Sequence, residues 1–299
     1  MRLLPLCLLL LLAGCSTPSS KNDNHTEEVD KAPKRYGWDG DLYGDVKSIV
    51  ITNYAVDNKL YGPELKADYS ETHKFNDLGH TTEIYYDWDA DKIIDRTHIY
   101  NYDDKNHIKS VDVYDYEKDN NVSSSYVYET DNRGNITFEA HYKDIILTYG
   151  SRYIYNADDL PIEVIRYDEN SSLRSKGIIK YNDYNAMTSL TAYNAKGKMI
   201  QEIKLGYNII PEKPSSAYSI SYDEDSGDID VITEYKYHYN EKKQEIKKIT
   251  ERKLEREYTE EHYEYDAMGN LQEIKRYESE ARILKSITKF TIDYRKQKM

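Results

Sequence analysis

The sequence predicts an all-β protein whose antiparallel β-hairpin repeats form one elongated, twisted or partly curled sheet. Three observations predict this fold. Aromatic residues that precede a turn recur at nearly regular intervals, Tyr-x-Tyr pairs alternate with polar residues, and tyrosine outnumbers phenylalanine 32 to 3. Alternation with period two is the pattern of a strand that has one face against a core. The core must therefore be built largely from phenol rings.

The first 15 residues have the pattern of a secretory leader. Arg2 precedes a leucine-rich run that ends in Leu12-Ala13-Gly14-Cys15, and this run is too short to span a membrane stably. These last four residues resemble the bacterial lipobox, which implies a signal peptide at 1–14 and acyl chains, palmitate among them, on Cys15. Several acyl chains give durable anchoring. We therefore expect a lipoprotein of the bacterial cell envelope at the outer membrane, with a plain cleaved signal as the alternative.

The remaining chain divides into three parts. Residues 15–43 hold the lipidated cysteine and a polar stretch with no apolar periodicity, which predicts a disordered tether. Residues 44–294 form the predicted repeat domain, and 295–299 form a short tail.

The repeat has a period of about 26 residues. Its anchors are aromatic, with one departure, and are spaced 27, 28, 25, 26, 26, 32 and 26 residues apart: Phe75, Tyr102, Thr130, Tyr155, Tyr181, Tyr207, Tyr239 and Tyr265. Four positions after seven of the anchors stand Gly79, Asn106, Gly134, Asp159, Asn185, Lys243 and Gly269. Gly, Asn and Asp tolerate the left-handed backbone that closes a hairpin turn on a bulge. Each unit thus predicts two turns and two strands of about eight residues.

One segment leaves a helical alternative open. Residues 244–261 read QEIKKITERKLEREYTEE, which has the composition of a helix. The flanking tyrosines and the phase of the repeat favour strands instead.

Several segments resemble the YD repeat of the Rhs type. The fullest match is Tyr265-Asp266-Ala267-Met268-Gly269-Asn270-Leu271 followed by Tyr277, and partial matches begin at Phe75, Asp131 and Tyr193. The resemblance spans roughly residues 44–294. It implies antiparallel sheets that curl into spirals or shells, in large secreted toxins and cell-surface proteins with carbohydrate contact. This chain has too few strands for the closed shell that the family forms, and it shows neither the family's self-cleaving end segment nor a toxin domain after Tyr294. We therefore expect a sheet that stays open or curls only in part, and no toxin role.

Composition and motifs exclude several functions. The net charge of −13 repels nucleic acid. Both cysteines lie within the first 15 residues, so the mature chain has no thiolate cluster for zinc. Asp87-Trp88-Asp89-Ala90-Asp91 has Lys92 where a calcium loop needs glycine, and 223–228 predicts at most a weak calcium loop. Ser286 and Lys289 would point to opposite faces of a strand. We therefore expect no enzyme activity, metal site or cofactor.

The function predicted from these observations is a lipid-anchored envelope scaffold or binding protein. Its tyrosine- and acid-rich sheet would present rings that stack on sugars, and carboxylates that accept hydroxyl hydrogen bonds, to a glycan or an envelope protein. The candidate binding residues are Tyr100, Tyr102, Tyr235 and Tyr237. The alternative is a partner-binding lipoprotein, such as an immunity protein against a basic toxin, that uses its negative charge for steering.

Overall fold

The computed structural model describes residues 42–59, 62–116, 122–279 and 281–295. The predicted signal peptide, Cys15 and most of the tether lie outside these residues. The first nine strands are β1 (Val46–Lys59), β2 (Gly62–Phe75), β3 (Thr81–Asp87), β4 (Arg96–Tyr102), β5 (Ile108–Asp115), β6 (Val122–Thr130), β7 (Ile136–Lys143), β8 (Ile146–Tyr155) and β9 (Pro161–Asp168). The next nine are β10 (Leu173–Tyr181), β11 (Met187–Asn194), β12 (Met199–Gly206), β13 (Ser216–Tyr222), β14 (Ile229–Tyr239), β15 (Glu245–Arg252), β16 (Glu257–Tyr265), β17 (Leu271–Glu278) and β18 (Ile283–Tyr294).

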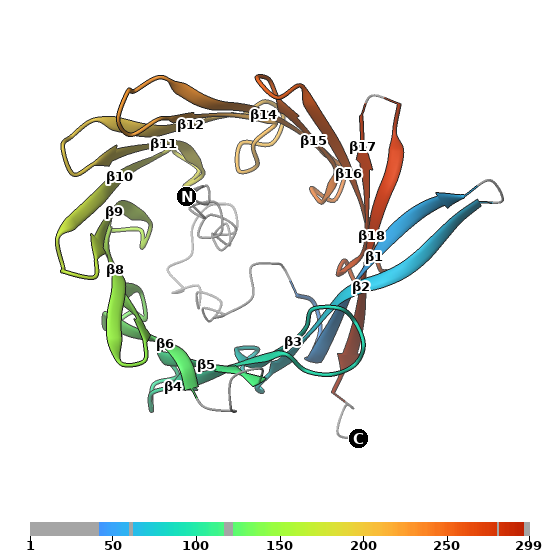
Figure 1. Ribbon diagram of the computed structural model, residues 1–299, viewed down its shortest axis with the longest axis horizontal. Helices are drawn as coiled ribbons and strands as arrows, with labels where there is room; N and C mark the ends of the chain where they lie inside the picture. Colours follow the sequence, from blue (N-terminus) through green and yellow to red (C-terminus); the bar gives the residue numbers. More distant parts are fainter. Residues whose placement is uncertain (1–41, 60–61, 117–121, 280, 296–299) are drawn as a thin grey trace, which may run out of the picture.

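The strands form a closed antiparallel barrel (Figure 1). Each strand pairs with the next along the chain, and β18 pairs with β1, for example through Asn53 and Thr288. The all-β class and the hairpin repeat are therefore confirmed. The expected open or partly curled sheet is wrong, as is the argument that the chain has too few strands to close. Closure removes both exposed sheet edges, whose unpaired backbone groups would otherwise invite aggregation.

The predicted helix alternative for 244–261 is also wrong. This segment contributes β15 and most of β16, joined by a turn at 253–256. Its alternating side chains pair across the two strands, as in Lys248 with Glu261. The composition favours a helix, but the tertiary pairing of both neighbours overrides this local preference.

The left-handed turn positions are confirmed at one end of the barrel. Gly79, Asn106, Gly134, Asp159, Asn185, Lys243 and Gly269 all have φ between 60° and 97°. The first turn residue is Asn or Asp, and its side chain caps the turn: Asn76 Oδ1 accepts the backbone N–H groups of Leu78 and His80, both at 3.0 Å. We call this end, which holds the turns after the anchors, the anchor rim.

Anchor tyrosines tie neighbouring repeats together along the anchor rim. The hydroxyl of Tyr155 donates to the backbone carbonyl oxygen of Ile136 at 2.7 Å. In the same way, the hydroxyl of Tyr265 donates to the backbone carbonyl oxygen of Glu245 at 2.7 Å. Tyr102, Tyr181, Tyr207 and Tyr239 bond to Thr81, Pro161, Met187 and Pro214 in the same way. The anchor therefore has a structural reason to be tyrosine rather than phenylalanine.

One face of the sheet lines the lumen. On a concave face side chains converge, so groups influence one another across several strands. Side chains of successive strands form buried clusters on one face: Val164, Leu190 and Ile203 belong to one cluster, and Tyr126 and Tyr128 pack against another. The strand register places these residues on the same face of the sheet. This face is therefore the concave, lumenal face.

The opposite, exterior face carries ion pairs between neighbouring strands. They include Lys74–Glu83, Lys176–Glu163, Lys236–Glu251, Lys247–Glu260 and Lys275–Glu264, with N–O distances of 2.7–3.5 Å. A lipid-facing barrel instead needs an apolar exterior band and strands of about nine to eleven residues, whereas β3, β4 and β13 have seven. The described exterior face is therefore rich in paired charges.

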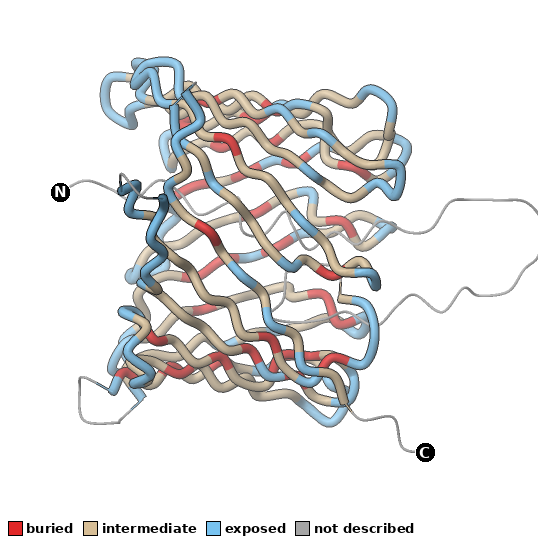
Figure 2. The backbone as a smooth tube through the Cα atoms, turned by 90° about the vertical axis from the view of Figure 1, so that its right-hand side faces the viewer, coloured by how far each residue is buried: buried red, intermediate tan, exposed pale blue. Residues whose placement is uncertain are grey.

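The barrel is wide and short. Figure 2 shows that the strands run obliquely between the two rims, where exposed residues gather. Eighteen strands spaced about 4.8 Å apart and tilted by about 40° place opposing backbones ~35 Å apart. Side chains cannot fill such a width, and barrels of this strand number leave a channel. The lumenal face is therefore the largest concave surface of the described chain.

Candidate binding site in the barrel lumen

A comparison of equivalent positions in the repeats shows where the lumenal face departs from its own pattern. The first strand residue after each anchor-rim turn pairs with the anchor. In seven repeats this residue is Thr81, Ile108, Ile136, Pro161, Met187, Glu245 and Leu271. Glu245 is the one ionisable residue in this set. The fold does not require a carboxylate there, because its sister repeats use apolar residues or threonine.

A second set of equivalent positions lies three residues further along the same strands. Its members are Ile84, Val111, Glu139, Val164, Leu190, Lys248 and Ile274. Five are aliphatic and pack in the wall, and Ile84, Val111, Val164 and Leu190 are at most 4 % exposed. Glu139 and Lys248 break this pattern. Charged groups in a position built for aliphatic packing mark the two places where the lumen is chemically distinctive.

The first place is a cluster around β7, formed by Tyr126, Tyr128, Glu139, Tyr149 and Tyr153. Tyr153 Oη donates to Glu139 Oε2 at 3.3 Å, and Tyr128 lies directly opposite Glu139 in the register. Burial raises the pKa of the Glu139 carboxyl, while the Tyr153 hydrogen bond and nearby Arg166 oppose that rise. This β7 cluster is a polar patch of a carboxyl group surrounded by phenol rings.

Histidine completes an aromatic ladder in the β7 cluster. The ring of His141 lies 4.5 Å from that of Tyr126 and 5.1 Å from that of Tyr149, so three adjacent strands each contribute a ring. Such cross-strand aromatic contacts stabilise a sheet pair by roughly 0.2–1 kcal/mol. Burial lowers the pKa of His141, which favours the neutral ring that stacks here.

The second place is a cluster around β15, formed by Tyr237, Tyr239, Glu245, Glu261 and Tyr263. Tyr263 Oη donates to Glu261 Oε2 at 3.1 Å, and Glu245 lies opposite Tyr239 in the strand register. Burial raises the pKa of Glu245 to about 7, and the nearby Glu261 carboxylate adds to the rise. Burial also raises the pKa of Tyr237, and Glu245 and Tyr235 contribute. This β15 cluster brings two carboxyl groups and three phenol rings from three adjacent strands to one part of the lumen.

The four candidate tyrosines all lie on the lumenal face, but they divide into two groups. Tyr235 and Tyr237 belong to the wall of the β15 cluster, and their rings stack at 6.4 Å with planes 15° apart. Tyr100 and Tyr102 pack against the buried side chains of Ile108 and Val111. The Tyr102 hydroxyl bonds to Thr81, so this residue has a structural role on the rim.

The carboxyl groups of the lumen were not among the predicted site residues. Glutamate is frequent throughout this acidic chain, so Glu139 and Glu245 do not stand out in composition or in any local motif. An alignment of the repeats on their turns would have identified both, because the equivalent positions in the other repeats carry no acidic residue. Ser286 and Lys289 do lie on opposite faces of β18, as the strand pattern predicts.

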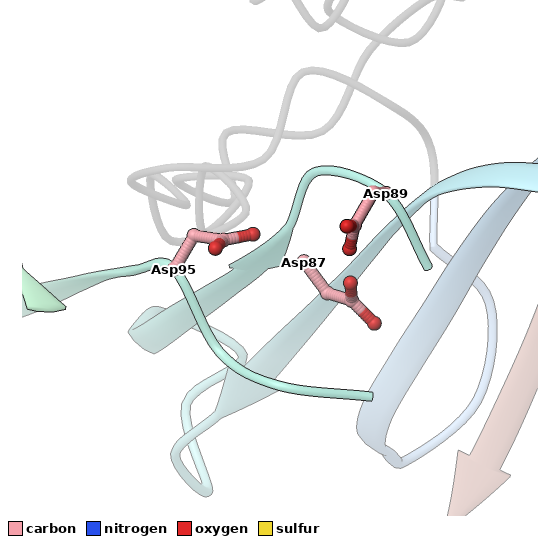
Figure 3. Close-up of side chains that lie close together, drawn as sticks. All are labelled: Asp87, Asp89 and Asp95. Carbon is pink, nitrogen blue, oxygen red and sulfur yellow. The ribbon is translucent and has the colours of Figure 1, made fainter. Parts of the chain in front are cut away.

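Three aspartates gather in the loop between β3 and β4 (Figure 3). Carboxylate oxygens of Asp87, Asp89 and Asp95 lie within 4.8 Å of one another, a grouping that could hold a cation. Backbone hydrogen bonds already account for their placement. Asp87 accepts the N–H groups of Asp91 and Lys92 at 3.1 and 2.9 Å, and Asp95 accepts that of Trp88 at 2.6 Å. The sequence had pointed to an acidic turn here without Asp95.

The loop at 223–228 is likewise organised by the chain itself. Asp223 Oδ1 accepts the N–H groups of Asp225 and Ser226 at 3.0 and 2.7 Å. Lys198 Nζ donates to the carbonyl oxygens of Glu224 and Asp225 at 3.3 and 2.6 Å. A lysine ammonium therefore uses carbonyl groups that a weak calcium site would need.

Comparisons with known proteins give likeness of fold and no family. No protein-family model and no curated protein sequence matches the chain. A porin-like protein from Bacteroides uniformis is similar over 84% of this chain and 98% of its own, with 10% identity and a TM-score of 0.45. A porin-like protein from Bacteroides vulgatus covers 84% and 99%, with 6% identity and a TM-score of 0.36.

The chain is also similar to part of a much larger toxin assembly. The match to TcdB2-TccC3 without its hypervariable C-terminal region covers 81% of this chain but 16% of that one, with 10% identity and a TM-score of 0.29. This chain therefore spans only a small part of that assembly's length. No helix long and apolar enough to cross a membrane occurs among the described residues.

Proposed function

We propose that the protein is a binding protein of the bacterial cell envelope that takes a glycan into its lumen. The observation that carries the proposal is that Glu139 stands at a mostly aliphatic wall position and Glu245 at a position otherwise held by apolar residues or threonine, each near tyrosine rings. Tyrosine faces stack on sugar rings, and carboxyl groups bond to sugar hydroxyls. The two clusters lie in different sectors of the wall, so an extended glycan has more than one point of contact.

The polar exterior supports a water-facing barrel rather than one embedded in lipid. We propose that the acylated Cys15 supplies the membrane attachment, at the outer membrane, and that residues 15–43 connect it to the barrel. A fully extended chain spans at most about 3.5 Å per residue. The tether therefore allows the barrel to stand well clear of the headgroups. We also propose that the repeat domain is a short relative of the YD-type repeats and has no toxin domain.

A glycan array followed by titration calorimetry tests the binding role. Tyr237→Ala should weaken the binding of a glycan found on the array by at least tenfold, because it removes a stacking face. Tyr218→Ala is the matched control, since Tyr218 stands on the exterior face of β13. Equal loss in both variants, or no glycan bound by the intact protein, would overturn the proposal.

A second candidate function is the capture of a protein partner at the rim opposite the anchor rim. Exposed apolar side chains stand on the turns of both rims: at this rim Ile93 is 66 % exposed, Ile145 96 %, Ile146 68 % and Leu254 57 %, and at the anchor rim Ile209 is 95 % exposed. Apolar side chains left in water favour a contact surface. A pull-down from envelope extract tests this candidate, and steep weakening between 50 and 500 mM salt is expected for an immunity-type partner that is steered by charge. Stacking on a glycan should depend little on salt.

A further inference from the structure

One stretch of strand edge stays open although the barrel closes. β2 pairs with β3 only from Ser70 onward, because Ser70 lies opposite Asp87 at the end of β3. Over residues 62–69, the one described strand that pairs with β2 is β1. This part of the β1–β2 hairpin reaches beyond the ring of the other strands (Figure 1). We call residues 62–69 of β2 the open edge, because no described strand covers its outer side.

Pro63 shows which residues turn their backbone groups outward at the open edge. It lies opposite Asn58 of β1. Proline has no N–H to donate to a ladder, so within a sheet its nitrogen faces the unpaired side. Hydrogen-bonded and non-hydrogen-bonded residue pairs alternate along an antiparallel pair of strands. The N–H and C=O groups of Leu65 and Ala67 therefore also point outward, and such a row of groups is a template for another strand.

The side chains of the open edge alternate in character. Leu65 is 41 % exposed and lies opposite Val56, so two apolar residues share one face of the hairpin. Glu64 and Lys66 point to the other face, and both are exposed. Glu64 pairs with Lys59 across the hairpin. A strand that complements this edge needs an apolar residue opposite Leu65, with a basic residue and an acidic residue on either side of it.

We propose that the open edge pairs with the open edge of a second copy of this chain. Glu64-Leu65-Lys66 is its own complement in an antiparallel ladder. When Leu65 of the two copies stand opposite each other, Glu64 of each copy faces Lys66 of the other, and opposite charges at such positions stabilise a strand pair. A register that places Lys66 opposite Lys66 would instead set Glu64 against Asp68, so that like charges repel.

The register centred on Leu65 also suits the backbone. The Leu65 N–H of each copy donates to the Leu65 carbonyl oxygen of the other, and the Ala67 N–H donates to the Pro63 carbonyl oxygen of the other. The two hairpins then form one continuous antiparallel sheet, in which Val56 and Leu65 of both copies make an apolar row. This inference is independent of the glycan function, because it concerns an exterior edge and not the lumen.

Cysteine cross-linking of the full-length protein tests the register. Beyond the predicted leader the chain has one cysteine, Cys15, whose sulfur the proposed lipid occupies. Residues opposite each other in an antiparallel pair have Cα atoms about 4.5–5.5 Å apart, which suits a disulfide. Leu65→Cys should therefore form covalent dimers roughly tenfold faster than Leu254→Cys, which changes another exposed apolar residue at a turn. The unaltered protein gives the background from Cys15.

Charge reversal tests the pairing through sedimentation equilibrium in density-matched detergent. An interface of this size is weak, so the protein is measured up to about 100 µM. Glu64→Lys and Lys66→Glu should each weaken the dimer by roughly tenfold, because each turns both attractive pairs into repulsive ones. An equimolar mixture of the two variants should dimerise again, since each supplies the charge that the other lacks. Glu169→Lys, at an exposed turn position, is the control for the change in net charge.

Three results would overturn the proposal. They are a protein that stays monomeric over the whole concentration range, a Glu64→Lys variant that dimerises as well as the unaltered protein, and a Leu65→Cys variant that cross-links no faster than Leu254→Cys. Circular dichroism of each variant should match that of the unaltered protein, because the open edge lies outside the closed ring. None of these results bears on binding in the lumen, so a failure here leaves the glycan function standing.

Discussion

Arg282 Nη2 lies 2.9 Å from Glu260 Oε1 and joins the turn between β17 and β18 to the exterior face of β16. Glu260 is only 1 % exposed because its neighbours cover it. Lys247 Nζ lies 3.0 Å from the same oxygen, and Tyr258 Oη donates to Oε2 at 2.7 Å. Hydrogen bonds from Tyr258, His262 and Lys247 lower the pKa of Glu260 to about 2 in spite of its desolvation. A single carboxylate thus organises the exterior surface of three neighbouring strands.

Glu260→Gln should lower the free energy of unfolding by about 2 kcal/mol at pH 7, because it leaves Lys247 and Arg282 without their counter-charge. Urea denaturation measures this loss. The stabilisation should be complete above pH 4.5 and disappear as the pH falls toward 2, since the folded pKa lies below the unfolded one. Glu264→Gln is the control, because its pair with Lys275 is exposed and contributes at most about 0.5 kcal/mol. Equal losses in the two variants would contradict the central role of Glu260.

His98 should make the barrel sensitive to mild acid. Burial lowers the pKa of this lumenal histidine to about 4, with repulsion from Arg96 and His73 as further causes. Because the unfolded chain binds the proton more readily, stability should be full above pH 6.5 and fall as the pH drops toward 4. Between pH 7 and pH 5 the loss should be about 2 kcal/mol.

Urea denaturation of His98→Gln at the two pH values tests this expectation. The variant should lose most of the pH dependence that His98 contributes. His238→Gln, which changes an exposed side chain on the exterior face of β14, should retain it. If the unfolding free energy of His98→Gln falls between pH 7 and pH 5 as much as that of the unaltered protein, another group is responsible.

Arg295 should hold the seam of the barrel closed. Its guanidinium donates to Asp45 Oδ1 at 2.6 Å, to the carbonyl oxygen of Phe75 at 2.5 Å and to that of Val46 at 3.2 Å, so it joins the end of β18 to the start of β1 and the end of β2. Arg295→Ala should therefore speed amide hydrogen exchange in β1 and β18, where strands about 240 residues apart meet.

The exchange of β9 and β10, on another part of the wall, serves as an internal reference for Arg295→Ala. Arg252→Ala provides the matched variant, because the Arg252 side chain is half exposed and pairs with Glu255 and Glu257. Arg252→Ala should leave amide hydrogen exchange in β1 and β18 as slow as in the unaltered protein. A uniform rise in exchange around the whole barrel would contradict a local role for Arg295.

The anchor hydroxyls should contribute separately to stability. Tyr155→Phe keeps the ring and removes the hydrogen bond to Ile136, which should lower the unfolding free energy by about 1 kcal/mol. Tyr265→Phe should have the same effect through Glu245. Because the two bonds lie in separate repeats, the double variant should lose about 2 kcal/mol. No change in the midpoint of urea unfolding for either variant would refute the structural role of the hydroxyl.

Lipidation at Cys15 should be the source of membrane attachment. Cys15→Ser should move the protein from the detergent phase to the aqueous phase in a detergent partition experiment and should abolish labelling with palmitate. The polar exterior face predicts that the barrel has no further affinity for the detergent phase. A Cys15→Ser protein that stays with the detergent would point instead to a wall embedded in lipid.

Much of the wall could be predicted from the chain. Local chemistry places each turn: Asn or Asp opens it, a residue that tolerates positive φ stands three positions later, and alternation assigns each tyrosine to a face. Gly79, Asn106 and Gly134 have the positive φ that the residues of their own turns predict. The lumenal clusters were harder to predict, because Glu139 and Glu245 become significant only when their apolar counterparts in other repeats are set beside them.

The sequence by itself determined the repeat, the turns and the alternation of side chains, since hydrogen bonds and steric preferences within a few residues specify them. Only the tertiary structure decided that the sheet closes and which face lies inside. Closure depends on the tilt and stagger summed over 18 strands until Asn53 meets Thr288. No local segment contains that sum, and the lumen with its paired glutamates and tyrosines exists only because the two ends of the sheet meet.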